Sequence, residues 1–184
     1  GDNSVIRSFT YNDKAPWPES ADGDGFSLVL LRPAGNPDHS NPRNWRTSVY
    51  VNGTPAGSDA TEFAENPTAD LDRDGTIALL EYAFLSSDSA ANDSILPIRE
   101  ITMHDFGSVS ALSFTFLRNL AADDLIYTVQ LSDDLEIWDP DSSALIHLSS
   151  VNQGNGTSRE TYLMASQLDA QERKFIRLHV QLQE

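Results

Sequence analysis

The feature that most constrains the fold is the alternation of apolar and polar side chains over residues 98–184. In the stretch 175–182, Ile176, Leu178 and Val180 alternate with polar residues. A period of two is typical of a strand that buries one face. Short strands at this spacing, about seven in all, predict a β-sandwich. The clearest of the other expected strands lie at 109–117, 126–131, 145–151 and 157–164.

The remainder of the chain divides into two parts. Residues 1–58 are expected to form strands at 4–11 and 26–31, with a long loop rich in Pro and Asn at 33–44. Residues 59–97 are expected to hold a short helix over 60–66, an acidic loop, and a helix over 77–85. The sequence therefore predicts a mainly β fold, an immunoglobulin-like or jelly-roll-type β-sandwich with a short loop–helix insert. The expected domains are 1–58, 59–97 and 98–184.

Charge and composition exclude several classes of function. The chain has 12 Lys and Arg against 28 Asp and Glu, a net charge of -16. Such a polyanion repels nucleic acid and anionic membrane surfaces, so no nucleic-acid partner is expected. No apolar run is long enough to cross a bilayer, so no membrane insertion is expected. Without cysteine, disulfides and Cys-ligated zinc are excluded.

The acidic loop carries the one strong motif. Its 12 residues, 70–81, fit the EF-hand-like pattern D-x-D-x-D-G-x5-E. Ca²⁺ is a hard cation that takes six to eight oxygen ligands, and Gly75 allows the sharp turn at position 6. The alternative is a solvated acidic turn that caps the following helix. We expect one Ca²⁺ ion, with the ligands Asp70, Asp72, Asp74, the Thr76 carbonyl and Glu81.

Other candidate sites carry weaker signals. Asp22 and Asp24 could supply ligands to a second ion, although a plain turn is favoured. The histidines are not spaced as metal ligands, and two of them, His147 and His179, fall on outward strand positions. The motifs G-x-S-x-G and H-E-x-x-H are missing, so an enzyme is not expected. Three tryptophans could stack on sugar rings, but core packing is favoured: Trp17, Trp45 and Trp138.

Three stretches resemble known families. Residues 70–85 (DLDRDGTIALLEYAFL) resemble the dockerin-like or thrombospondin-type-3-like calcium segment of secreted bacterial proteins, which implies calcium binding. Residues 9–57 resemble the C-terminal half of a bacterial lamin-tail domain through FTYNDKAPWP, ADGDGFSLVLL, NWR and GTPAG. That likeness implies an immunoglobulin-like β-sandwich without catalytic residues. Residues 112–138 and 174–181 resemble a C-terminal β-module of large exported proteins of Verrucomicrobia and Planctomycetes, through LSFTFLR, YTVQLSDDLEIW and KFIRLHV.

Together these features predict a non-catalytic, calcium-binding structural or adhesive module of a larger secreted or cell-surface protein. Its expected partners are the calcium ion and either a polysaccharide or another extracellular module. Two alternatives stay open. One is a calcium-dependent carbohydrate-binding module, suggested by the sandwich, the ion and three tryptophans. The other is an accessory region of an extracellular hydrolase.

Overall fold

The computed structural model describes residues 7–91, 100–106, 109–140, 143–164 and 173–183. The described chain is mainly antiparallel β-structure with one short α-helix, as the sequence predicts. Among the described helices, none is long and apolar enough to cross a lipid bilayer. The elements are η1 Glu19–Ala21, β1 Leu28–Leu30, η2 Pro33–Gly35, η3 Pro42–Asn44, β2 Trp45–Thr47, α1 Ala78–Phe84, β3 Glu100–Phe106, β4 Val109–Asn119, β5 Leu125–Ser132, β6 Leu145–Asn152, β7 Thr157–Met164 and β8 Phe175–Leu182.

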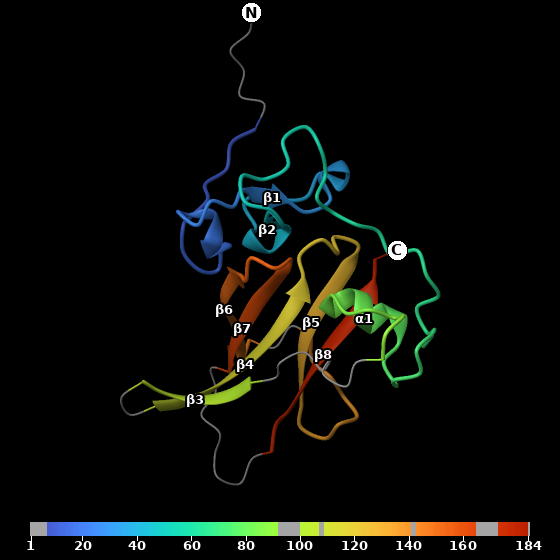
Figure 1. Cartoon of the computed structure of the whole chain (residues 1–184). Coiled ribbons are helices and arrows are strands. Elements are labelled where there is room, and N and C mark those ends of the chain that lie inside the picture. Colours follow the sequence, from blue (N-terminus) through green and yellow to red (C-terminus); the bar gives the residue numbers. More distant parts are fainter. Residues whose placement is uncertain (1–6, 92–99, 107–108, 141–142, 165–172, 184) are drawn as a thin grey trace, which may run out of the picture.

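Two sheets form the sandwich-like body of the molecule (Figure 1). One has the strand order β3-β4-β7-β6, and the other pairs β5 with β8. They pack together through an apolar cluster centred on Phe114, Phe116 and Val129, which alternate with more polar neighbours along β4 and β5. Ile176 and Leu178 of β8 complete this cluster, so the alternation at 175–182 marks a buried face, as expected.

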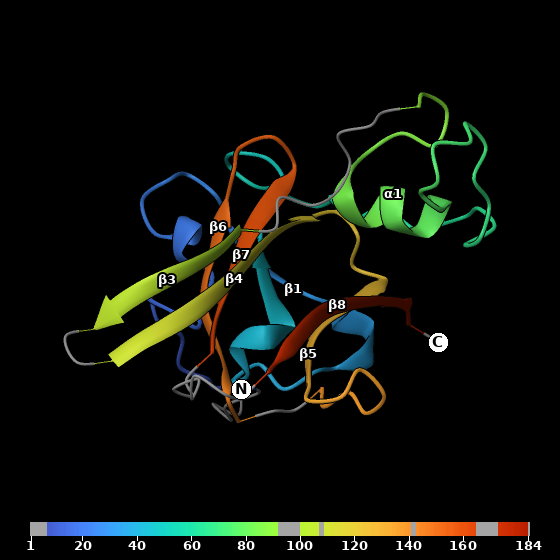
Figure 2. The same ribbon diagram turned by 90° about the horizontal axis from the view of Figure 1, so that it is seen from below.

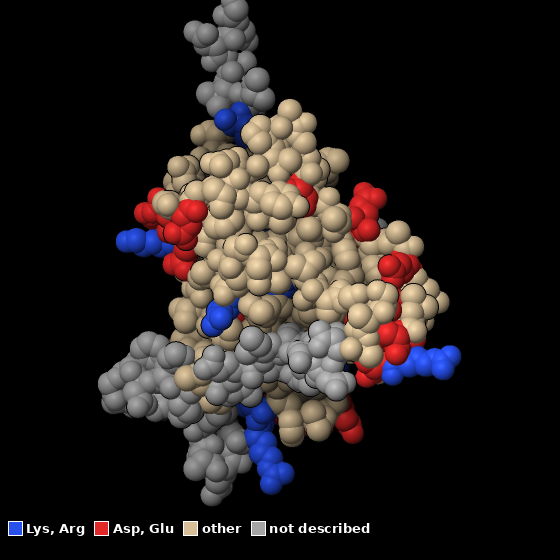
Figure 3. Space-filling view, in the orientation of Figure 1, with Lys and Arg blue, Asp and Glu red and all other residues tan. Residues whose placement is uncertain are grey.

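The helix α1 lies beside the sandwich, next to the sequence-distant β5–β8 pair (Figures 1 and 2). Ala83 is fully buried there and packs with Ala122 and Leu125. On the face shown in Figure 3, acidic side chains gather over the segments around this helix. The helix therefore joins an acidic loop to a packed apolar core.

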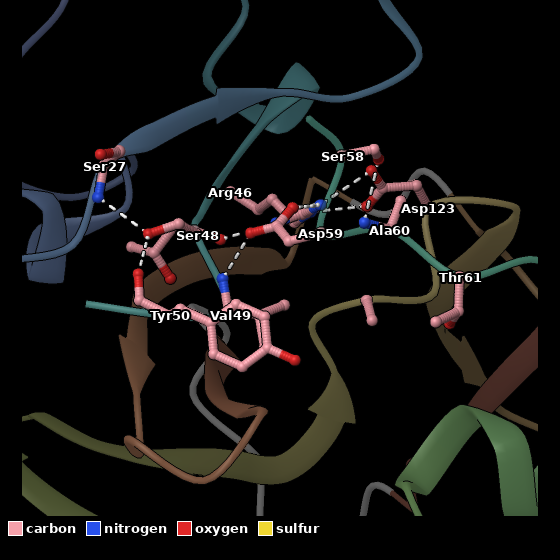
Figure 4. A network of polar contacts seen from close by, with 12 residues as sticks. Ser27, Arg46, Ser48, Val49, Tyr50, Ser58, Asp59, Ala60, Thr61 and Asp123 are labelled. Atoms are coloured by element: carbon pink, nitrogen blue, oxygen red, sulfur yellow. Dashed lines mark hydrogen bonds and ion pairs between the residues drawn. The ribbon is translucent and has the colours of Figure 1, made fainter. Parts of the chain in front are cut away.

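A buried arginine joins the N-terminal segment to the rest of the chain (Figure 4). Arg46 of β2 is 1% exposed. Its Nη2 lies 2.7 Å from Asp59 Oδ1, and its Nε lies 2.6 Å from Asp123 Oδ1. Burial disfavours the charged form of Asp59, but the hydrogen bonds from Arg46 and the Val49 N–H, together with the charge of Arg46, outweigh this and lower the pKa of Asp59. Three distant parts of the sequence thus share one buried ion network.

Further polar contacts close the seam between β2 and β6. The Asn152 side chain donates hydrogen bonds of 3.0 Å to Thr47 Oγ1 and 2.9 Å to the Ser48 carbonyl. The Asn152 backbone N–H donates to Ser20 Oγ at 3.1 Å. These groups are buried, so their hydrogen bonds fix the orientation of the N-terminal segment.

Two expectations about secondary structure are wrong. Residues 60–66 do not form a helix, because the N–H groups of Thr61 and Phe63 instead donate to the Ala121 carbonyl and to Asp124 Oδ2. The segment is therefore held extended against the loop before β5. Residues 7–11 do not form a strand, and 1–6 lie outside the described residues.

The inner face of β6 is polar, which the sequence does not predict. Ile146 and Leu148 are exposed, whereas the half-buried His147, expected to point outward, lies with its Nε2 2.8 Å from Glu160 Oε2. A bulge between His147 and Ser149 then brings Ser150 inward. His179 is exposed, as expected, and the side chain of His104 lies outside the described residues.

Glu160 should make the fold sensitive to acid. Burial opposes its ionisation, but Arg118 and His147 lower the pKa of Glu160 to about 2, below its usual value of 4.5. A group with a lowered folded pKa stabilises the protein above pH 4.5 and loses that contribution as the pH falls toward 2. We expect this group to account for about 2 kcal/mol of lost unfolding free energy between about pH 4.5 and 2.5.

Urea unfolding of metal-stripped protein in calcium-free buffer at a series of pH values measures this contribution, because metal binding then adds no pH dependence of its own. Glu160→Gln should flatten the pH dependence relative to the natural chain. Equal slopes for the two proteins would contradict the assignment to Glu160.

Candidate metal centre

The acidic loop is shaped by its own aspartates. Each accepts a hydrogen bond from a backbone N–H further along the loop. The Asp74 N–H donates to Asp72 Oδ1 at 3.1 Å, and the Thr76 N–H donates to Asp74 Oδ1 at 2.7 Å. The Gly75 N–H donates to Asp70 Oδ2 at 3.2 Å. These bonds curl the backbone so that the carboxylates face the inside of the loop.

The turn depends on two left-handed backbone angles. Arg73 has φ 63° and Gly75 has φ 94°. A Cβ at Gly75 would meet no atom within 4 Å, so glycine is required there by the angle and not by lack of space. This is the role expected for position 6 of the loop.

The three aspartates converge. One carboxylate oxygen each from Asp70, Asp72 and Asp74 lies within 4.8 Å of the others. Asp70 Oδ1 and Asp72 Oδ2 are buried, and neither finds a hydrogen-bond partner among the described residues. Buried carboxylate oxygens are costly unless a hydrogen-bond donor or a cation compensates them, so these residues fit a bound metal ion.

Glu81 stands next to this group, in the first turn of α1. Its side chain is 1% exposed, and in the described structure its Oε2 is buried without a hydrogen-bond partner. It is not one of the three residues that meet within 4.8 Å. Burial, together with the carboxyls of Asp88, Asp72 and Asp74, raises the pKa of Glu81 to about 7. The fold therefore concentrates negative charge that a cation would offset.

Asp88 belongs to the same cluster and is missed by the sequence motif. Its Oδ1 accepts a 3.0 Å hydrogen bond from the Leu71 N–H, and its Oδ2 is buried without a partner among the described residues. The chain returns here because α1 ends at Leu85, in a left-handed conformation, with the Ser86 N–H bonded to the Glu81 carbonyl. In the sequence, Asp88 lies in a polar stretch typical of a linker.

The loop is fixed to the sandwich through α1. The Ala78 N–H donates to the Ala69 carbonyl at 2.7 Å, which ties the start of the loop to the start of the helix. Asn119 Nδ2 donates to the Tyr82 carbonyl at 2.9 Å, and the Tyr127 hydroxyl donates to the Ala83 carbonyl at 2.8 Å. Hydrogen bonds therefore join the acidic loop to α1 and join α1 to strands β4 and β5.

Three predicted ligands remain: the Thr76 carbonyl in the acidic loop, and Asp22 and Asp24 in the N-terminal segment. The Thr76 N–H is bonded within the loop, and the role of its carbonyl stays a prediction. Asp22 and Asp24 are exposed, and each is followed by a glycine with positive φ, as in a turn. In the part of the chain that the structure describes, the Asp70–Asp72–Asp74 group is the one cluster of three or more side chains that could hold a metal ion.

Comparisons of the chain with protein-family models, with curated proteins and with solved structures found no match.

Proposed function

We propose that this chain is a non-catalytic, calcium-stabilised structural or adhesive module of a larger secreted or cell-surface protein. One observation carries the proposal. Three aspartates meet within 4.8 Å beside a buried glutamate, and one buried oxygen each of Asp70, Asp72 and Glu81 lacks a hydrogen-bond partner among the described residues. A divalent cation would compensate all of these groups at once.

Calcium is the ion that the donor set favours. Every candidate side-chain ligand is a carboxylate, which suits hard cations better than zinc or copper. Magnesium demands a near-ideal octahedron, whereas Ca²⁺ accepts the larger and more variable oxygen shell that a 12-residue loop can supply. The motif at 70–81 supports the same choice. A secreted or cell-surface setting would supply calcium to a site of micromolar to millimolar affinity.

The contacts of α1 support a structural role. The Tyr82 hydroxyl lies 2.8 Å from the Thr61 carbonyl and 2.9 Å from Asp124 Oδ1. The neighbouring Asp123 holds Arg46 of the N-terminal segment. An ion that orders the loop would thus stabilise the helix next to the seam between the N-terminal segment and the sandwich. We propose that the whole chain binds a polysaccharide or another extracellular module.

Trypsin cleavage at the loop tip tests whether calcium orders the loop. Arg73 is exposed at the tip and is the only Lys or Arg between Arg46 and Arg99. We expect saturating calcium to slow cleavage after Arg73 by about tenfold or more, because the bound ion reduces opening of the loop.

Cleavage after Lys14 is the internal control. Lys14 is exposed in the N-terminal segment, so its cleavage reports any effect of calcium on trypsin itself. Equal calcium responses at Arg73 and Lys14 would contradict the proposed role of the ion.

A further inference from the structure

A cavity of about 620 Å³ lies between the N-terminal segment and the sandwich. Its walls come from β4, β5, β6, β7 and the nearby residues 140 and 143 on one side, and from residues 16, 18, 31–32 and 41–45 on the other. This volume lies within the range of about 300–1,000 Å³ that small-molecule sites occupy. The cavity is separate from the proposed metal centre, because none of the loop residues 70–81 lines it.

The charge of the cavity is opposite to that of the chain. Its lining includes three arginines, Arg32, Arg43 and Arg118, and a single carboxylate, Glu160. In the whole sequence, 28 acidic residues face 12 basic ones, so this concentration of cationic side chains is unusual. Low-dielectric walls focus such a field and attract anions into the cavity.

Glu160 is fully engaged by its neighbours. It is 5% exposed, lies 3.0 Å from Arg118 Nε and 2.8 Å from His147 Nε2, and accepts a 2.9 Å hydrogen bond from Ser150 Oγ. These contacts fix the Arg118 and His147 side chains at the cavity wall. Glu160 therefore compensates Arg118 and leaves the other two arginines without a carboxylate of the cavity to neutralise them.

Within the described ranges, neither Arg32 nor Arg43 forms an ion pair with a carboxylate. Arg32 Nη1 is buried and finds no hydrogen-bond partner among the described residues. Arg43 is exposed and is one of the residues that line the cavity. Burial and the charge of Glu160 raise the pKa of Tyr162, and the charges of Arg118 and Arg43 act against that rise. A guanidinium with free donors is suited to bidentate contact with a carboxylate or sulfate.

Aromatic rings supply the apolar part of the wall. Tyr162 lines the cavity and is only partly buried, and its ring is supported from the core by the nearly parallel ring of Phe116, with centroids 6.1 Å apart. Trp45 and Tyr127 add further ring surface. Such walls fit the apolar face of a cyclic ligand, whereas an inorganic ion alone would leave them without contacts.

We propose that this cavity binds a small organic anion with a cyclic body, the size of an acidic monosaccharide, through Arg32 and Arg43. The shared chemistry is a carboxylate or sulfate group carried on a ring. Because the site is distinct from the metal loop, binding does not depend on the calcium proposal.

Calorimetric titration of the full chain with D-glucuronate and with D-glucose 6-sulfate tests this inference and separates the two anionic groups. D-Glucose and inorganic sulfate are the matched probes for the ring alone and the anion alone. We expect at least one charged sugar to bind about tenfold or more tightly than both probes. The proposal would be overturned if glucose or inorganic sulfate bound as tightly as the charged sugars. It would also be overturned if neither charged sugar gave heat at about 10 mM.

Two variants localise the site. Arg43→Gln changes an exposed side chain, so the fold should be retained, and combination with Arg32→Gln should weaken binding by about tenfold or more. Arg159→Gln is the control, because Arg159 is exposed on β7 beside Glu160 and does not line the cavity. Circular dichroism checks the fold of each variant. Undiminished binding by a folded Arg43→Gln or double variant would place the ligand elsewhere and overturn the assignment.

Discussion

Replacing Arg46 by methionine is expected to lower the free energy of unfolding by about 3–5 kcal/mol. The guanidinium is 1% exposed and lies within 2.7 Å of carboxylates from Asp59 and Asp123. Its removal leaves the carboxylates of Asp59 and Asp123, which are 4% and 16% exposed, without their cation, and burial penalises a charge that has lost its partner. Because the three residues come from different parts of the chain, the loss should affect the seam between the N-terminal segment and the sandwich.

Urea unfolding at neutral pH measures this loss. Arg159→Met is the matched control, since Arg159 is exposed and should change stability by about 0.5 kcal/mol or less. Adding Asp59→Asn and Asp123→Asn to Arg46→Met should recover part of the loss, because the unpaired charges are then removed. A loss below about 1 kcal/mol for Arg46→Met would show that the buried network does not hold the seam.

Saturating calcium is expected to raise the free energy of unfolding by about 2.7–4.1 kcal/mol when its concentration is 100 to 1,000 times the Kd. The proposed ion would bind the folded loop, where the carboxylates of Asp70, Asp72 and Asp74 are already brought together. Glu81→Gln should remove most of this increase, because it takes one charge from the most buried acidic position of the cluster. Thermal or urea unfolding in calcium and in EGTA gives the difference directly.

Asp22→Asn is the control for this experiment. Asp22 is exposed in a turn, so the calcium increment of this variant should equal that of the natural chain. Magnesium at the same concentration should produce a smaller increment, because the loop offers a large oxygen shell. Equal increments for Glu81→Gln and the natural chain would contradict the predicted ligand set.

The parts of the fold that the sequence predicts are those in which the local pattern and the tertiary environment agree. The strand expected at 175–182 is β8, and its Ile176 and Leu178 face the core. The helix expected over 77–85 spans Ala78–Phe84. The spacing of the acidic loop predicts the convergence of its three aspartates, because Asx turns and Gly75 are local devices.

What the sequence does not predict depends on long-range partners. His147 points inward because Glu160, from the adjacent strand β7, binds it, and alternation cannot reveal that pairing. Residues 60–66 are extended because the loop at 121–124 provides acceptors for them. Asp88 reaches the loop only through the turn at the end of α1. The cavity requires the N-terminal segment to pack on the sandwich, which no local pattern specifies.

Titration calorimetry of metal-stripped protein with Ca²⁺ tests the central proposal most directly. One ion per chain should bind, with a Kd between about micromolar and millimolar, and the Glu81→Gln variant should bind more weakly. Neither heat nor retained ion at several millimolar Ca²⁺, in a protein that is folded, would show that the buried carboxylates around Asp72 do not form a calcium site.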